Sequence, residues 1–211
     1  MAAKIFTIAQ QKGGAGKTTL TAHLAFALAG GRRKVALVDI DPQQSLTQWF
    51  RQREARLGDG AGLRLSQISG WRVQNEVERL AATHDVVLID SPPHAETEAK
   101  VAIRCADLVV VPVQPSPMDV WATRPTLDLA RQEKVPALLV LNRVPPRANL
   151  TGEMLAALAE LGARLANTRI GNRVAFASAL AEGRAVGEVQ PSGQATAEIR
   201  ALARELMHRA A

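Results

Sequence analysis

Short apolar segments recur along the chain and alternate with stretches whose hydrophobic residues follow a helical period. The apolar segments are rich in Val, Ile and Leu and do not alternate with polar residues. That pattern is typical of strands buried on both faces of a sheet. The predicted strands are Ile5–Ala9, Val35–Asp39, Leu63–Leu65, Val86–Asp90, Leu108–Val113 and Ala137–Leu141.

Helical patterns separate these strands, and the first of them stops at Gly30 and Gly31, a common kind of helix end. Alternation of strands and helices predicts an α/β fold with a mainly parallel, twisted sheet covered by helices on both faces. No internal repeat or linker is visible, so residues 1–211 are expected to form one domain. The predicted helices are Lys17–Ala29, Gln44–Arg56, Val73–Ala82, Glu96–Cys105, Met118–Glu133, Thr151–Leu161 and the tail, Gln194–Arg209.

The tail places its apolar residues near one helical face and its arginines elsewhere. A membrane-surface helix is conceivable, but the tail lacks Trp and Phe and carries Glu198 and Glu205. No stretch approaches the roughly 20 apolar residues that span a membrane. We therefore expect a terminal helix packed on the domain and no stable membrane association. The apolar residues of the tail are Ile199, Leu202, Leu206 and Met207.

The composition limits the classes of partner and site. The 211 residues include a single cysteine, Cys105, which excludes an intrachain disulfide framework and indicates a reducing cytoplasm. Aromatic residues make up 3%, too few for a single-strand binder built on stacked rings. The net charge of +6 suggests a polyanionic partner, nucleic acid before membrane. A solvated, arginine-rich surface explains the charge equally well.

The strongest motif lies between the first predicted strand and the first predicted helix, in residues 12–19, KGGAGKTT. Glycines let backbone N–H groups turn toward phosphate oxygens, and a helix N-terminus favours negative charge. In such a phosphate-binding loop (P-loop), Lys17 would reach the β- and γ-phosphates and the Thr18 hydroxyl would ligate Mg²⁺. The predicted nucleotide-binding residues are Gly13, Gly14, Ala15, Gly16, Lys17, Thr18 and Thr19.

Acidic residues end two of the other predicted strands. Asp90, at a strand end beside the P-loop, suits an indirect ligand of Mg²⁺; the alternative is a residue that begins the turn at Pro92. Asp39 and Asp41 close the second strand, where a carboxylate can orient the water that attacks the γ-phosphate. Either could instead cap the helix that follows.

One position departs from the ordinary P-loop pattern. Gln11 stands where that pattern has glycine, and an extra lysine, Lys12, follows it. Together with the segments DIDPQ at 39–43, DSPP at 90–93 and LNR at 141–143, this spelling resembles the deviant Walker A ATPases. Within them the chain is most similar to small partition ATPases of the ParA type. The resemblance extends over nearly the whole chain.

The resemblance implies a P-loop NTPase that uses ATP and Mg²⁺ and forms a homodimer on ATP. It implies that Asp41 positions the attacking water, that Asp39 supports the metal or lysine network, and that Lys12 reaches the nucleotide of the partner subunit; a solvated surface lysine is the alternative for Lys12. It also makes Asp119 and Trp121 interface candidates, although Trp121 could equally pack in the core.

Asn142 follows the last strong strand, where a side-chain amide can read a base edge. A guanine-specific motif fails because Pro145 stands where it requires Asp, so adenine is favoured. An ordinary turn residue is the alternative for Asn142.

The resemblance implies an ATPase that binds double-stranded DNA without sequence preference, works on the nucleoid in the cytoplasm, and positions a plasmid, chromosome or other cargo. A ParB-like or other adaptor would stimulate hydrolysis. No helix-turn-helix is placed before Lys4, so DNA contacts would fall to arginines. The alternatives are a MinD-like membrane-associated ATPase and a metabolic enzyme of the dethiobiotin-synthetase kind. The candidate DNA-binding residues are Arg169, Arg173, Arg184, Arg200 and Arg204.

Overall fold

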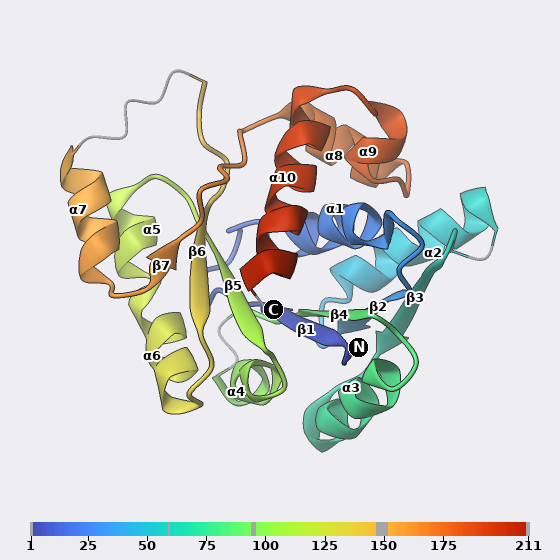
Figure 1. The fold of residues 1–211 in the computed structure, drawn as a ribbon, viewed down its shortest axis with the longest axis horizontal. Coiled ribbons are helices and arrows are strands. Elements are labelled where there is room, and N and C mark those ends of the chain that lie inside the picture. The colour runs from blue at the N-terminus through green and yellow to red at the C-terminus, as the bar shows by residue number, and fades with distance from the viewer. Residues whose placement is uncertain (1, 59, 94–95, 147–151, 210–211) are drawn as a thin grey trace.

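The computed structural model describes residues 2–58, 60–93, 96–146 and 152–209. A seven-stranded sheet runs through them, with the strand order β3-β2-β4-β1-β5-β6-β7 and all neighbours parallel. The predicted parallel α/β fold is thereby confirmed. The strands are β1 Lys4–Ile8, β2 Val35–Asp39, β3 Leu63–Gln67, β4 Val86–Asp90, β5 Leu108–Val113, β6 Ala137–Leu141 and β7 Arg164–Leu165 (Figure 1).

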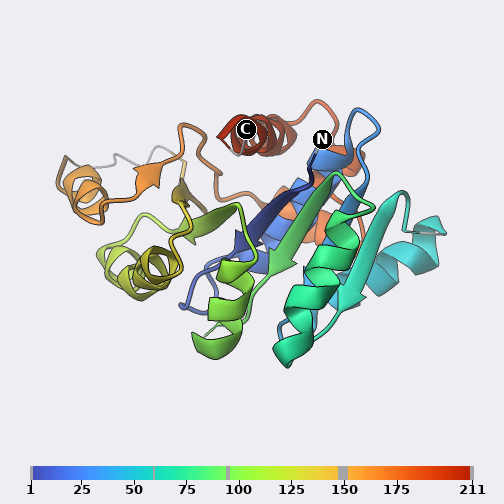
Figure 2. The same ribbon diagram turned by 60° about the horizontal axis from the view of Figure 1, so that its bottom comes forward.

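Helices cover both faces of the sheet (Figures 1 and 2). One face carries the core cluster to which the P-loop helix, α2 and the C-terminal helices contribute. Its helices are α1 Lys17–Ala29, α2 Ser45–Leu57, α8 Val174–Ala181, α9 Val186–Val189 and α10 Gln194–Arg209. The other face carries two core clusters, under α3 Val73–Ala81, α4 Glu96–Arg104, α5 Pro117–Trp121, α6 Arg124–Gln132 and α7 Gly152–Glu160.

The central strands are apolar throughout because both of their sides are covered. In β2, Val35 and Leu37 belong to the core cluster under α1, whereas Ala36 and Val38 belong to the cluster under α3. All five residues of β2 and of β4 are buried. Successive strand side chains point to opposite faces, so a strand buried on both needs no polar alternation.

Four predicted strands have the predicted bounds. The predicted helix Met118–Glu133 is not continuous in the structure. It is interrupted between α5 and α6 because Pro125 stands in the first turn of α6. A proline in a helix interior lacks the N–H donor and clashes with the preceding turn, so a new helix begins there. The pattern also failed to predict the two-residue strand β7 and the short helices α8 and α9. Residue 151, the predicted start of α7, lies outside the described residues.

The tail packs as expected. Ile199, Leu202 and Leu206 are buried on α10, in the same core cluster as α1. Within the described part of the chain, no helix is long and apolar enough to cross a membrane.

His23 joins α1 to the C-terminal helices. It is buried in α1, where its Nδ1 accepts the backbone N–H of Val186 at 3.1 Å. Nδ1 is therefore unprotonated, and Nε2 donates to the carbonyl oxygen of Phe176 at 3.2 Å. Burial lowers the pKa of His23 to about 4. The packing of α8 and α9 on α1 thus requires a neutral imidazole.

We expect the stabilisation that His23 provides to depend on pH. Between pH 4 and 6.5 the unfolded chain binds a proton that the folded chain does not, so the contribution of His23 rises with pH across this window and is complete above it. Denaturant unfolding of the wild type and His23→Gln at several pH values measures the difference, which should grow by about 3 kcal/mol. The contributions of other titrating groups to the free energy of unfolding cancel, because both proteins contain these groups. A difference that stays constant with pH contradicts the assignment.

Candidate nucleotide site

The predicted P-loop connects β1 to α1 at the carboxyl edge of the sheet. Its backbone takes positive φ at Gly14 and Gly16, +77° and +89°, values that only glycine adopts without strain. α1 begins directly after Gly16, so its first backbone N–H groups have no partner within the helix. A glycine turn followed by such a helix end forms a cradle for phosphate oxygens.

Asn142 closes one side of this loop. Its Nδ2 donates to the carbonyl oxygen of Ala15 at 2.8 Å, and a Cβ on Gly16 would lie 2.6 Å from that nitrogen. The amide therefore supports the P-loop. It can approach this closely only because residue 16 is glycine and has no Cβ. The predicted role of Asn142 in reading adenine stays a prediction.

Lys17 folds back over the loop that precedes it. The side chain is buried, and Nζ donates to the carbonyl oxygen of Gln10 at 2.9 Å. Burial lowers the pKa of Lys17, while the nearby carboxylates of Asp90 and Asp41 act in the opposite direction. An ammonium group held inside the loop is suited to a bound polyphosphate, whose charge would favour the protonated form.

Thr18 and Asp90 meet beside Lys17. The Thr18 hydroxyl donates to Asp90 Oδ2 at 2.6 Å, and Thr21 Oγ1 lies 3.4 Å from Oδ1. Asp90 is fully buried, and desolvation raises its pKa to about 7. A hydroxyl and a carboxylate oxygen are the ligands that Mg²⁺ prefers, and a cation would offset the cost of burying the charged carboxylate. Two of the three side chains predicted to hold Mg²⁺, Thr18 and Asp90, are thus together and chemically suited to it.

The two other acidic residues differ in their surroundings. Asp39 Oδ2 accepts the N–H and the hydroxyl of Thr47, at 2.8 and 2.7 Å, and Oδ1 accepts the N–H of Asp41 at 3.1 Å. Because Thr47 lies in the first turn of α2, this geometry supports the capping alternative for Asp39. Asp41 Oδ1 accepts the N–H of Gln43 at 2.9 Å. The metal role of Asp39 and the catalytic role of Asp41 stay predictions.

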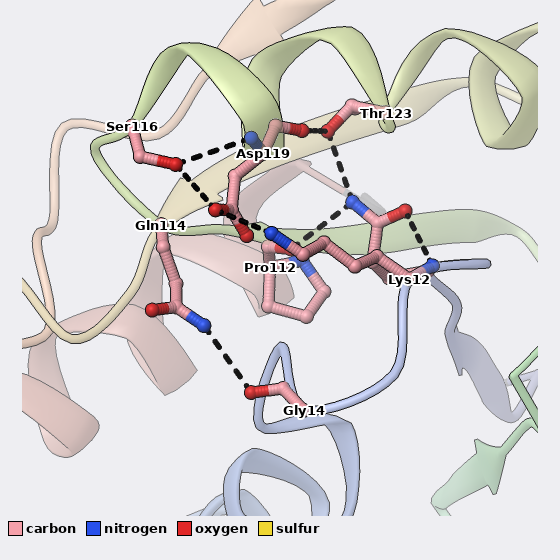
Figure 3. A network of polar contacts seen from close by, with 8 residues as sticks. Lys12, Gly14, Pro112, Gln114, Ser116, Asp119 and Thr123 are labelled. Atoms are coloured by element: carbon pink, nitrogen blue, oxygen red, sulfur yellow. Dashed lines mark hydrogen bonds and ion pairs between the residues drawn. The ribbon is translucent and has the colours of Figure 1, made fainter.

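Lys12 forms an ion pair within its own chain (Figure 3). Its Nζ lies 2.8 Å from Asp119 Oδ2, and the lysine side chain is 36% exposed. Ser116 caps α5 by accepting the N–H of Asp119 and donates its hydroxyl to the same carboxylate at 2.5 Å. Asp119, an interface candidate from the sequence, is therefore the anchor of the second P-loop lysine.

Gln10, which no sequence motif distinguishes, connects the same loop to α5 and α6. Its Nε2 donates to Thr123 Oγ1 at 2.9 Å, and its Oε1 accepts from the Thr126 hydroxyl at 3.2 Å. From the loop after β5, Gln114 Nε2 donates to the carbonyl oxygen of Gly14 at 3.2 Å (Figure 3). A buried glutamine directly after a strand has no distinctive spacing, so only the packed structure reveals this role.

Trp121 lies on the surface. It is 67% exposed, so the alternative of simple core packing is wrong. Met118, also on α5, is 65% exposed. The short helix that anchors Lys12 thus presents two apolar side chains to solvent.

The candidate DNA-binding arginines lie on or near the C-terminal helices. Arg169 and Arg173 line one pocket, but Arg173 forms an ion pair with Glu198. Arg200 donates to the carbonyl oxygen of Pro191 at 3.1 Å and is exposed, as is Arg204 one turn further along α10. Arg184 lies half-buried between α8 and α9. The glutamate beside Arg173 reduces the charge available to a phosphate there.

A family model matches the part of the chain that contains this site. The family model of the CobQ/CobB/MinD/ParA nucleotide binding domain matches residues 6–186. The chain belongs to this family. The matched region contains the P-loop, Asp90 and Asn142, the residues that the structure brings together at the sheet edge.

Two relatives illustrate the range within the family. Over 206 residues the chain is 34% identical to maintenance of carboxysome distribution protein A of Halothiobacillus neapolitanus, covering 92% of this chain and 93% of the relative. It is 28% identical to protein ParA of Rhizobium radiobacter, covering 82% and 81%.

Solved structures share the fold at lower identity. Pyrococcus furiosus cell division ATPase MinD superposes with a TM-score of 0.80 at 22% identity, covering 99% of this chain and 100% of that one. An ATP complex of McdA from Cyanothece gives 0.81 at 18% identity, covering 99% and 97%.

We expect Gly16→Ala to abolish measurable nucleotide binding, because the new Cβ would meet the Asn142 amide and strain a residue at φ +89°. Calorimetric titration with ATP and Mg²⁺ measures the affinity, which should fall at least about 100-fold, or roughly 3 kcal/mol. Gly31→Ala is the matched control, since φ is +76° but nothing lies within 4 Å of the new Cβ. Wild-type affinity in Gly16→Ala would contradict this account of the loop.

Proposed function

We propose that this chain is an ATP-switched positioning ATPase. ATP and Mg²⁺ would bring two chains together, the dimer would bind double-stranded DNA without sequence preference, and an adaptor would stimulate hydrolysis and release. The observation that carries the proposal is the pairing of a buried P-loop lysine, Lys17, with a second lysine, Lys12, held at the edge of the same loop. Family membership supports the ATPase activity.

Each residue of this site would have a separate role in hydrolysis. Bound Mg²⁺ would neutralise charge on the phosphates, and Thr18 and Asp90, which are hydrogen-bonded to each other, would hold it. Lys17 would orient the β- and γ-phosphates from inside the loop. Asp41 would hold the attacking water, and Lys12 would contact the transferring phosphoryl group of the partner's nucleotide.

The cargo that we favour is a large cytoplasmic body of the carboxysome kind. The support is the relative from Halothiobacillus neapolitanus, which is named for carboxysome distribution and matches over nearly the whole of both chains. Plasmid or chromosome partition is the second candidate, supported by the ParA relative. In either case the protein would work on the nucleoid in the cytoplasm.

Lys12 must leave Asp119 before it can reach a partner's nucleotide, so we expect Asp119→Asn to strengthen ATP-dependent dimerisation. A partly exposed ion pair contributes up to about 1 kcal/mol, so the dimer dissociation constant should fall up to about fivefold. Sedimentation with ATP and Mg²⁺ measures it. In a Lys12→Ala background Asp119→Asn should have no such effect. Weaker dimerisation of the single variant would show that Asp119 assists Lys12 instead of restraining it.

We expect Asp41→Ala to retain ATP and to accumulate the DNA-binding dimer, since binding does not need the water-positioning carboxylate. Filter binding to unrelated duplex DNA without nucleotide, with ADP and with ATP tests this directly. Binding should appear only with ATP and fall steeply as salt rises, because arginines would displace counterions from phosphates. Lack of DNA binding in every state would refute the proposal, and lipid vesicles and small-molecule substrates would be tested next.

A further inference from the structure

Residues 174–189, which comprise α8, α9 and the turn between them, rest on two helices that both begin at nucleotide loops. α1 follows the P-loop, and α2 follows the loop that holds Asp41. Figure 1 shows α8 and α9 beside α1, at the end of the molecule where α10 begins. We name residues 174–189 the clamp segment.

Arg53 connects α2 to the clamp segment and is fully buried. Its guanidinium forms a two-pronged ion pair with Glu188, at 2.7 and 2.9 Å. Nε donates to the carbonyl oxygen of Gly60 at 2.9 Å, and Nη1 also lies 3.5 Å from that of Gly183. The ring of Trp49 lies 5.7 Å from the guanidinium carbon. A planar guanidinium group with this many partners fixes both the distance and the orientation of α2 relative to the clamp segment.

The backbones of α2 and the clamp segment also meet directly. Gly183 has φ +67°, and a Cβ there would lie 2.6 Å from the backbone nitrogen of Arg53 and 2.7 Å from the carbonyl carbon of Gln52. Trp49 Nε1 donates to the carbonyl oxygen of Arg184 at 3.3 Å. No flexible side chain separates the two elements at Gly183, so a shift of α2 must move the turn that carries Arg184.

The other side of the clamp segment is fixed to α1. His23 accepts the N–H of Val186 and donates to the carbonyl oxygen of Phe176. Glu188, besides binding Arg53, accepts the N–H of Ala185 at 2.7 Å. The clamp segment is thus bonded to both helices that leave the nucleotide loops.

A buried ion pair is weak evidence for stability, because well-packed apolar residues are often equally stabilising. What an ion pair adds is a defined relative position of the elements that it joins. We propose that Arg53 is a positioning residue which, through Glu188, transmits the state of the Asp41 loop to the clamp segment and to the arginines beside it. This inference deepens the proposed function and rests on its nucleotide switch.

The deciding variant is Arg53→Met/Glu188→Met, which removes both charges and leaves apolar groups in their place. We expect it to fold and to bind ATP within about twofold of the wild type, while the ratio of its DNA affinity with ATP to that with ADP falls about tenfold, a usual size for coupling between sites. An unchanged ratio would overturn the inference. Arg53→Lys, which keeps the charge without the fork, should show a smaller loss and serves if the double variant does not fold.

A control separates lost coupling from lost stability. Leu80→Ala removes a fully buried side chain of α3, in a core cluster on the opposite face of the sheet. It should lower the melting temperature and leave the ATP-to-ADP ratio unchanged. If Leu80→Ala lowers the ratio as much as the double variant does, the effect of Arg53 is only structural and the inference fails.

A second measurement keeps this test separate from that of DNA binding. Hydrogen exchange of the amides of residues 174–189 is compared between the ATP and ADP states. ATP-dependent protection in the wild type that disappears in the double variant supports the coupling even if the wild type binds no DNA, a result that would refute the DNA switch alone. Protection that is equal in both proteins, or no nucleotide effect in the wild type, overturns the inference.

Discussion

The parallel register of β1, β2 and β4 is the constraint on which the site depends. Ile8, Asp39 and Asp90 lie in one row across these three strands, so the loops that follow them begin at the same edge. Burial on both faces fixes this register, because a one-residue slip would exchange the side chains of the two core clusters. The P-loop, the Asp41 loop and Asp90 therefore converge although they lie far apart in the sequence. The contact from Thr18 to Asp90 joins residues that are 72 positions apart.

The two P-loop lysines have different surroundings and therefore differ in how easily they can exchange partners. Lys17 is buried inside the loop, where its ammonium group has the backbone carbonyl of Gln10 as a partner. Lys12 is partly exposed and paired with a carboxylate on a separate helix. A group held by one partly exposed ion pair can exchange partners at small cost, whereas a buried group is fixed in place. This contrast fits one lysine that serves its own nucleotide and one that is available to another chain.

The C-terminal helices belong to the helical layer on the P-loop side of the sheet. α10 contributes an apolar face to the core, and α8 and α9 are bonded to α1 and α2 through His23 and Arg53. Nucleotide loops and C-terminal arginines thus belong to one packed unit. A change at the sheet edge has a direct physical route to that surface, through side chains with few alternative positions.

The sequence by itself determined the alternation of strands and helices, the P-loop and the acidic residues at strand ends, because burial on both faces and glycine geometry leave local patterns. It also indicated α10, whose apolar face repeats with the helical period. Only the tertiary structure decided the partner of Lys12, the bonds of Gln10 and the capping geometry of Asp39, since these contacts join segments with no fixed spacing. Arg53 shows the difference most clearly. It lies on the buried face of α2 with Leu46, Trp49 and Phe50. Its buried charge is paired only because Glu188, 135 residues later in the sequence, folds against it.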